Sequence, residues 1–190
     1  MSEPASLLAQ CRIPPEGVRA FLAARGPRVT GWHDWARLGV DLREDELASL
    51  DLQTGMASAD FLRRLRDTAE RPADWLCAYD AGTQVLTIGQ TLFSDNWHSI
   101  VAVLAVLRRL GGFLPAGPDA QGLVLVHDWI FGHRGTLAAV ALGAGGSGIL
   151  ATVPDAPARI AAALGPVRDA VAAGRPAPIR DDLDALAAGD

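Results

Sequence analysis

The fold of this chain is decided by residues 75–91, which read WLCAYDAGTQVLTIGQT. Residues 75–79 and 84–91 are rich in the apolar, aromatic and β-branched side chains that strands favour. Between them, Asp80 and Gly82 supply the geometry of a tight turn. The stretch therefore predicts a β-hairpin, which gives the rest of the chain a sheet to pack on.

A helix is expected on each side of this hairpin. From Ser58, apolar residues fall on one face among several arginines, and Pro72 ends the run. After the hairpin, Ser94 or Asp95 can cap a helix that ends before Gly111. The second helix is apolar on nearly every side, so we expect it to contact a second apolar surface, either the N-terminal segment or another subunit.

Three further strands are predicted over residues 122–131, 136–142 and 148–153, because apolar runs there are separated by glycine-rich turns. An alanine-rich helix over residues 156–173 follows them. The expected fold class is α+β: a five-stranded antiparallel sheet with helices on its faces, in the order helix, strand, strand, helix, strand, strand, strand, helix.

The chain of 190 residues is long enough for one main domain. We expect a helical N-terminal extension over residues 1–57, the α+β domain over residues 58–174 and a loosely held tail over residues 175–190. The extension contains WHDW at residues 32–35, and two tryptophans beside turn formers are interpreted as holding a loop against the core. The extension is expected to be removable without unfolding the remainder.

Composition limits the possible partners and compartment. The net charge of −5 offers no basic field for nucleic acid. All 17 basic residues are arginine, which with the many alanines and glycines suggests a GC-rich bacterial genome. Two cysteines and no export signal at the N-terminus favour a cytoplasmic protein. The uncharged run of residues 135–153 has a glycine-rich centre, so it is interpreted as two strands and not as a membrane span.

Residues that could carry chemistry do not form a recognisable catalytic motif. His98, His127, Asp128 and His133 could supply metal ligands, but neighbouring residues of a strand point to opposite faces, so no metal site is expected. Cys77 alternates as a core residue does. The chain has neither a phosphate-binding loop nor a nucleophile elbow, and we expect no cofactor.

Residues 58–174 resemble the roadblock/dynein-light-chain family. The resemblance rests on the hairpin at residues 76–82, on the central helix at residues 100–110 and on the strands that end at residues 149–154. It implies a homodimer that pairs the strand at residues 122–131 with its copy and packs two central helices together. It also implies a non-enzymatic scaffold or regulator, with a small Ras-like GTPase as the partner.

The dimer interface would take apolar and aromatic residues of the central helix and the third strand, namely Trp97, Val101, Ala105, Val106, Leu125, His127, Trp129 and Phe131. Two other functions stay open. One is a toxin-neutralising immunity protein or secretion chaperone that binds through an acidic surface and exposed tryptophans. The other is a small hydrolase that uses His98 and His127, which requires the two rings to meet in one cleft.

Overall fold

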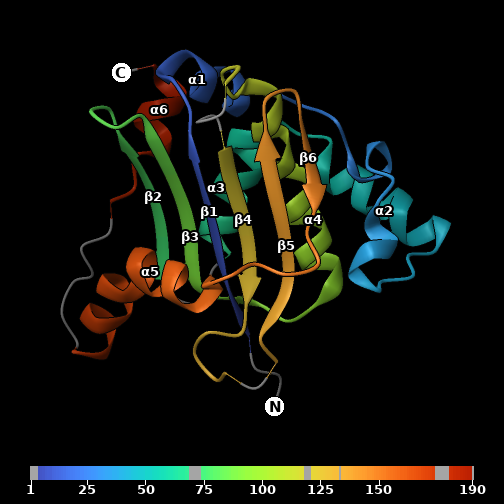
Figure 1. Cartoon of the computed structure of the whole chain (residues 1–190). Helices are drawn as coiled ribbons and strands as arrows, with labels where there is room; N and C mark the ends of the chain where they lie inside the picture. Colours follow the sequence, from blue (N-terminus) through green and yellow to red (C-terminus); the bar gives the residue numbers. More distant parts are fainter. Residues whose placement is uncertain (1–3, 69–73, 118–120, 133, 174–179, 190) are drawn as a thin grey trace.

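A single antiparallel sheet organises the chain (Figure 1). The computed structural model describes residues 4–68, 74–117, 121–132, 134–173 and 180–189. Over these residues the sheet has six strands in the order β2-β3-β1-β4-β5-β6. The strands are β1 (Ala5–Arg12), β2 (Trp75–Asp80), β3 (Val85–Ser94), β4 (Gln121–His127), β5 (Thr136–Gly143) and β6 (Gly146–Ile149).

Strand β1 lies in the middle of this sheet. It pairs with β3 on one side, where Ala9 faces Ile88, and with β4 on the other, where Ala9 faces Val124. The expected five-stranded sheet with a helical N-terminal extension is therefore wrong, and residues 1–57 are not an appendage. The physical reason is burial on both faces over most of the strand: residues 5–9 are all buried, so polar and apolar residues alternate only at its end, where Gln10 and Arg12 are exposed.

Helices cover the sheet on both faces (Figure 1). The main core lies on one face and takes side chains from α1 (Pro15–Ala23), α2 (Glu44–Thr54), α3 (Ser58–Asp67), α4 (Trp97–Leu107) and α6 (Leu183–Ala188). Helix α5 (Ala156–Ala172) packs on the opposite face, where Ile160 and Leu164 contact Leu8 and Leu125. Short 3-10 helices are η1 (Val29–Gly31), η2 (Trp35–Leu38) and η4 (Arg108–Phe113).

The hairpin predicted at residues 75–91 is confirmed. Asp80 Oδ1 accepts hydrogen bonds from the backbone N–H groups of Gly82 at 2.8 Å and Thr83 at 3.2 Å, which closes the turn. Helices were also predicted correctly from Ser58 and over residues 156–173, with α5 running continuously through Pro166. Helix α4 is capped by Asn96, not by Ser94 or Asp95.

Strands β4 and β6 differ from their predicted bounds. Strand β4 ends at His127 because Asp128 starts a turn, in which its carboxylate accepts from Gly132 N–H at 3.2 Å. Strand β6 begins at Gly146 because the turn after β5 is shorter than the whole glycine-rich run. The order of these elements along the chain is as predicted.

The N-terminal segment supplies the second apolar surface that α4 needs. Trp32 Nε1 donates to the backbone oxygen of Ala105 at 3.2 Å. The Arg108 guanidinium lies over the rings of Trp32 and Trp35, at 4.3 Å and 5.1 Å from their centroids. Asp34 accepts from Arg108 Nη1 at 2.7 Å. The interpretation of the WHDW segment as a loop held against the core is thus confirmed.

The end of the chain is held along the edge strand β2. Cys77 N–H donates to Arg180 O at 3.0 Å, and Asp182 N–H donates to Cys77 O at 2.8 Å. Leu183 is fully buried in the main core. The expectation of a loose tail is wrong for residues 180–189.

Within the described residues, no helix is both long and apolar enough to cross a membrane.

Candidate functional site

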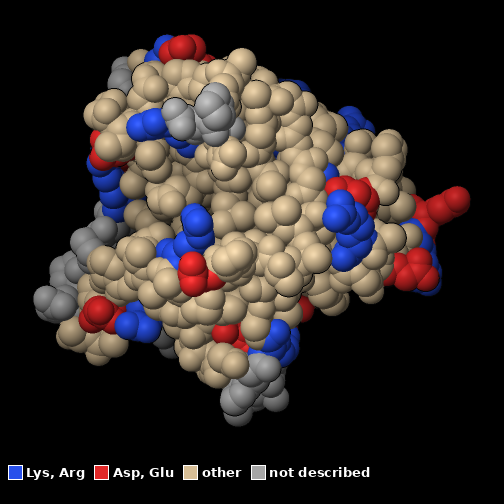
Figure 2. Space-filling view, viewed as in Figure 1, with Lys and Arg blue, Asp and Glu red and all other residues tan. Residues whose placement is uncertain are grey.

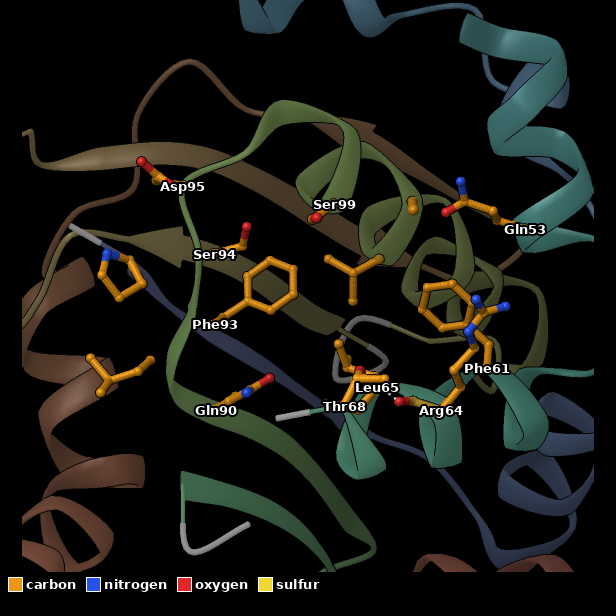
Figure 3. A pocket seen from close by; sticks show the side chains of 14 residues that line it. Gln53, Phe61, Arg64, Leu65, Thr68, Gln90, Phe93, Ser94, Asp95 and Ser99 are labelled. Atoms are coloured by element: carbon orange, nitrogen blue, oxygen red, sulfur yellow. Dashed lines mark hydrogen bonds between the residues drawn. The ribbon is translucent and has the colours of Figure 1, made fainter. Parts of the chain in front are cut away.

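A cavity of about 530 Å³ lies between β3, α3 and α4 (Figure 3). Strand β3 continues beyond Gln90, which pairs with Trp75, the first residue of β2. The chain then turns into α4, and α3 packs on the same face of the sheet, which leaves the cavity between them. Its walls combine apolar and polar surface, and the apolar side chains include Phe61, Leu65, Phe93, Ala102 and Val103. Its polar groups come from Gln53, Arg64, Thr68, Gln90, Ser94, Asp95 and Ser99. We call it the Gln90 cavity.

Gln90 is the polar residue that distinguishes this cavity. Gln90 lies two residues after Ile88 and four after Leu86 in β3, so its side chain is on the same face of the sheet as theirs, toward the main core. The residue is 3% exposed. Figure 3 shows its amide pointing from β3 toward Leu65 of α3 and Thr68, the residue that follows this helix. Its Oε1 is the only buried side-chain oxygen or nitrogen among the described residues that lacks a hydrogen-bond partner. A buried amide oxygen without a partner destabilises a fold by about 1–3 kcal/mol, so this position calls for an explanation.

Arg64 supplies positive charge to the same cavity. It is exposed on α3, and within the described part of the chain its guanidinium takes part in no ion pair. Its neighbours differ, since Arg63 Nε lies 2.7 Å from Asp184 and Arg66 Nη1 lies 3.0 Å from Asp181. The carboxylate of Asp95, also in the lining, has Arg134 at 3.9 Å. Among the described residues that line the cavity, Arg64 is therefore the cationic side chain that is available to a bound anion.

The sequence contained a signal for Gln90 that was not used. Gln90 stands in the predicted strand on the same alternation as Leu86 and Ile88, where a core residue is expected. A polar residue at a core position is informative because burial of an amide needs compensation. The cavity beside it could not be foreseen, because it depends on how α3 and α4 diverge above the sheet.

The candidate catalytic histidines have separate partners. His98 Nε2 lies 3.2 Å from Glu46 Oε1 of α2, and His127 Nδ1 lies 3.0 Å from Thr136 Oγ1 of β5. Burial lowers the pKa of His127, and the nearby charge of Asp128 opposes this only in part. The hydrogen-bond partners of His98 and His127 thus lie on different elements, α2 and β5.

The thiols and the candidate metal ligands also form no reactive cluster among the described residues. Burial raises the pKa of Cys11 to about 12, and burial with nearby Asp181 raises the pKa of Cys77. Both thiols are therefore protonated at neutral pH. The described part of the chain has no group of three His, Cys, Asp or Glu side chains placed to hold a metal ion. His133 lies outside the described residues.

Most of the expected interface residues lie inside the protein. Val101, Ala105, Val106 and Leu125 are fully buried. Trp97 packs against the main core, His127 is buried, and Trp129 is half-buried under the Arg168 guanidinium at 4.6 Å. Phe131 alone of the eight is exposed, at 41%. The reason is that the N-terminal segment covers α4 and that β1 and β5 pair with both edges of β4.

These contacts change the basis of the expected homodimer. The two apolar surfaces that suggested it are covered within one chain, and β4 has no free edge to pair with a copy of itself. On the face seen in Figure 2, basic and acidic side chains are interspersed and no broad basic patch is visible. That face thus lacks the electrostatic feature typical of nucleic-acid binding.

Comparison with known proteins found no family model, no curated protein and no solved structure that matches this chain. The roadblock resemblance, the GTPase partner and the immunity or chaperone alternative therefore stay predictions, and the candidate site rests on its geometry.

Proposed function

We propose that this protein is a binding module without catalysis of its own, and that its ligand occupies the Gln90 cavity. The observation that carries the proposal is a cavity of about 530 Å³ lined by Gln90, a buried side chain whose Oε1 has no hydrogen-bond partner. Ligand sites in proteins are commonly concave, mostly apolar and supplied with a few polar groups that fix orientation. The Gln90 cavity is of ordinary size for such a site, but its lining is more polar, with seven polar and seven apolar residues.

The lining supports binding over catalysis. Its hydroxyl groups belong to Thr68, Ser94 and Ser99, and none of its described residues is a histidine or a cysteine. Ser94 Oγ accepts from Asn96 N–H at 3.1 Å, so it helps to start α4. Thr68 Oγ1 donates to Arg64 O at 2.8 Å and helps to end α3. Two of the three hydroxyls thus already have structural hydrogen bonds, and the carboxylate of the described lining that could act as a base, Asp95, has Arg134 at 3.9 Å.

The proposal is tested by a ligand-observed NMR screen of small organic compounds against the whole protein. The test variant is Ser99→Trp, which places an indole in the cavity from an exposed position on α4. Its matched control is Ala161→Trp, an exposed position on α5 on the other face of the sheet. Both variants are first checked for a native circular dichroism spectrum and melting transition.

Compounds that bind the wild type are expected to bind Ala161→Trp equally and to lose at least tenfold in affinity with Ser99→Trp. They should also be recovered chemically unchanged after long incubation. Equal binding to Ser99→Trp would show that the cavity is not the site. Turnover of a compound that the Ser99→Trp variant no longer performs would show that the protein is an enzyme.

A further inference from the structure

Residues 180–188, which we call the edge segment, lie beside the edge strand β2 and lead into α6 (Figure 1). We propose that the edge of β2 and the arginines of α3 form a docking site for an acidic segment of a partner protein, and that the edge segment occupies this site in competition with it. The partner segment would carry carboxylates in an extended stretch, followed by a helical turn with a leucine. The site is separate from the Gln90 cavity, and the inference goes beyond the function proposed above.

The site holds the backbone of its occupant along the edge of β2. Cys77 N–H donates to Arg180 O at 3.0 Å, and Asp182 N–H donates to Cys77 O at 2.8 Å. Tyr79 N–H donates to Asp182 Oδ2 at 3.0 Å. The backbone groups of an edge strand can pair with any extended polypeptide, and many peptide-binding domains use this mode. Side chains must therefore supply the selectivity.

Two arginines on α3 select for carboxylates. Arg66 Nη1 lies 3.0 Å from both Asp181 Oδ2 and Asp184 Oδ2. Arg63 Nε lies 2.7 Å from Asp184 Oδ1. The indole of Trp75, the first residue of β2, also donates to Asp181 Oδ1 at 3.3 Å. A partner segment with acidic residues at these two positions has the charge that matches the site.

One apolar side chain anchors the edge segment. Leu183 is fully buried in the main core, and Leu186 packs against the same core while partly exposed. The two leucines are three residues apart, a spacing that places both on one face of a helical turn. Leu183 is the single buried residue among the described residues 180–189. An occupant thus needs a leucine directly after the extended acidic stretch.

The contacts of the edge segment are more exposed than those at the opposite edge of the sheet. At β6, Asp34 Oδ2 accepts from Ile149 N–H at 3.3 Å, and its partner Arg108 is 2% exposed. At β2, the side chains of Arg63 and Asp184 are 35% and 59% exposed, so water and salt weaken their ion pair. Another segment can replace such contacts with contacts of the same kind, whereas the cover of β6 is part of the core.

The edge segment makes the site autoinhibited. Because it belongs to the same chain, its local concentration at the site exceeds that of a free segment. A free segment binds only those molecules in which the site is open, and its apparent affinity falls by that fraction. Release of the edge segment should therefore raise the affinity of the site for a free acidic segment.

The experiment measures the binding of a fluorescein-labelled peptide with the sequence of residues 180–188, RDDLDALAA, to the full chain by fluorescence anisotropy. Leu183→Ser releases the edge segment by removing its anchor. A second chain, in which serine replaces both Asp181 and Asp184, releases it by removing its ion pairs with α3. Every variant is first checked for a native circular dichroism spectrum and melting transition.

Two further changes, each made in the Leu183→Ser chain, test the site itself. Arg66→Glu reverses the charge that faces the two carboxylates. Arg159→Glu is its matched control, because Arg159 is an exposed arginine of α5, on the other face of the sheet. A peptide that carries Leu183→Ser tests the anchor.

Both released chains are expected to bind the peptide at least tenfold more tightly than the wild type, because their site is open. In the Leu183→Ser chain, Arg66→Glu should weaken binding at least tenfold, since it replaces two attractions by repulsion, and Arg159→Glu should leave binding unchanged. The Leu183→Ser peptide should bind at least tenfold more weakly than the parent peptide, because it lacks the apolar side chain that is buried.

The proposal is overturned if neither released chain gains affinity while both keep their native spectra, or if Arg66→Glu and Arg159→Glu have equal effects. Loss of the native spectrum and melting transition in both released chains would also overturn it, because the edge segment would then be part of the fold and not an occupant. Light scattering of the wild type at rising concentration separates the remaining case. A dimer that Leu183→Ser abolishes would assign the site to the edge segment of a second copy and exclude a partner protein as its occupant.

Discussion

Replacing Arg109 with methionine tests whether the N-terminal segment is part of the core. Arg109 is 2% exposed, and among the described residues no carboxylate pairs with it. Its guanidinium instead donates to five oxygens of the segment between α1 and α3, namely Ala24 O, Pro27 O, Thr54 O, Met56 O and Ser58 Oγ. Burial lowers the pKa of Arg109 to about 10, so it stays charged at neutral pH. A single side chain thus joins η4 to residues 24–58.

The magnitude follows from the acceptors that lose their donor. Ala24 O keeps the N–H of Ser58 at 2.9 Å, and Ser58 Oγ keeps its own bond to Ala24 O at 3.1 Å. The carbonyls of Pro27, Thr54 and Met56 lose the donor that Arg109 supplies. At about 1 kcal/mol for each carbonyl, Arg109→Met should lower the free energy of unfolding by about 3 kcal/mol. For a chain of this length that corresponds to a fall in Tm of roughly 6–12 °C.

The assay is urea denaturation followed by tryptophan fluorescence and circular dichroism, with thermal melting as a second measurement. Arg64→Met is the matched control, because Arg64 is an exposed arginine without an ion pair in the described structure and should change stability by less than about 0.5 kcal/mol. Arg109→Lys should lie between the wild type and Arg109→Met, since an ammonium group has three donors in place of five. A loss below 1 kcal/mol for Arg109→Met would refute the reasoning.

Removal of residues 1–57 deletes β1 from between β3 and β4, so the remainder should lose its cooperative thermal transition; a sharp melt of the truncated chain would contradict the central position of β1. Burial raises the pKa of Asp34, but its hydrogen bonds to Arg108 outweigh this effect and hold the pKa below its ordinary value. Asp34→Asn should therefore lower the free energy of unfolding by about 2 kcal/mol at pH 7 and by less near pH 3. The control is Asp60→Asn, which removes an exposed ion pair on α3 and should change the stability little. Burial lowers the pKa of His127, so below about pH 6.5 the unfolded chain takes up the proton more readily than the folded chain, and the free energy of unfolding should decrease as pH falls. In urea titrations between pH 6.5 and 5, His127→Asn should show a shallower decrease than the wild type. An unchanged slope would show that His127 does not cause the decrease.

Local patterns in the sequence determined most of the elements. The hairpin at residues 75–91 was predictable because its turn residues act on their own neighbours, as the bonds from Gly82 and Thr83 to Asp80 show. Helices α3, α4 and α5 were predictable because their apolar residues recur at helical spacing or fill every side. The role of Trp32 and Trp35 was also foreseen, since large rings beside turn formers need apolar contact.

Only the tertiary structure decided where these elements meet. Residues 5–9 of strand β1 show no periodicity, because both faces of the strand are buried there. Its place in the sheet depends on β3 and β4, which lie more than 70 residues away in the chain. Because α4 is apolar on nearly every side, the sequence correctly predicted that a second apolar surface covers it. The sequence does not show whether that surface belongs to the same chain or to a second subunit. The Gln90 cavity has the same origin. A glutamine on the core side of a strand is visible in the sequence, whereas its unpartnered oxygen and the space beside it arise from contacts among β3, α3 and α4 that no local pattern encodes.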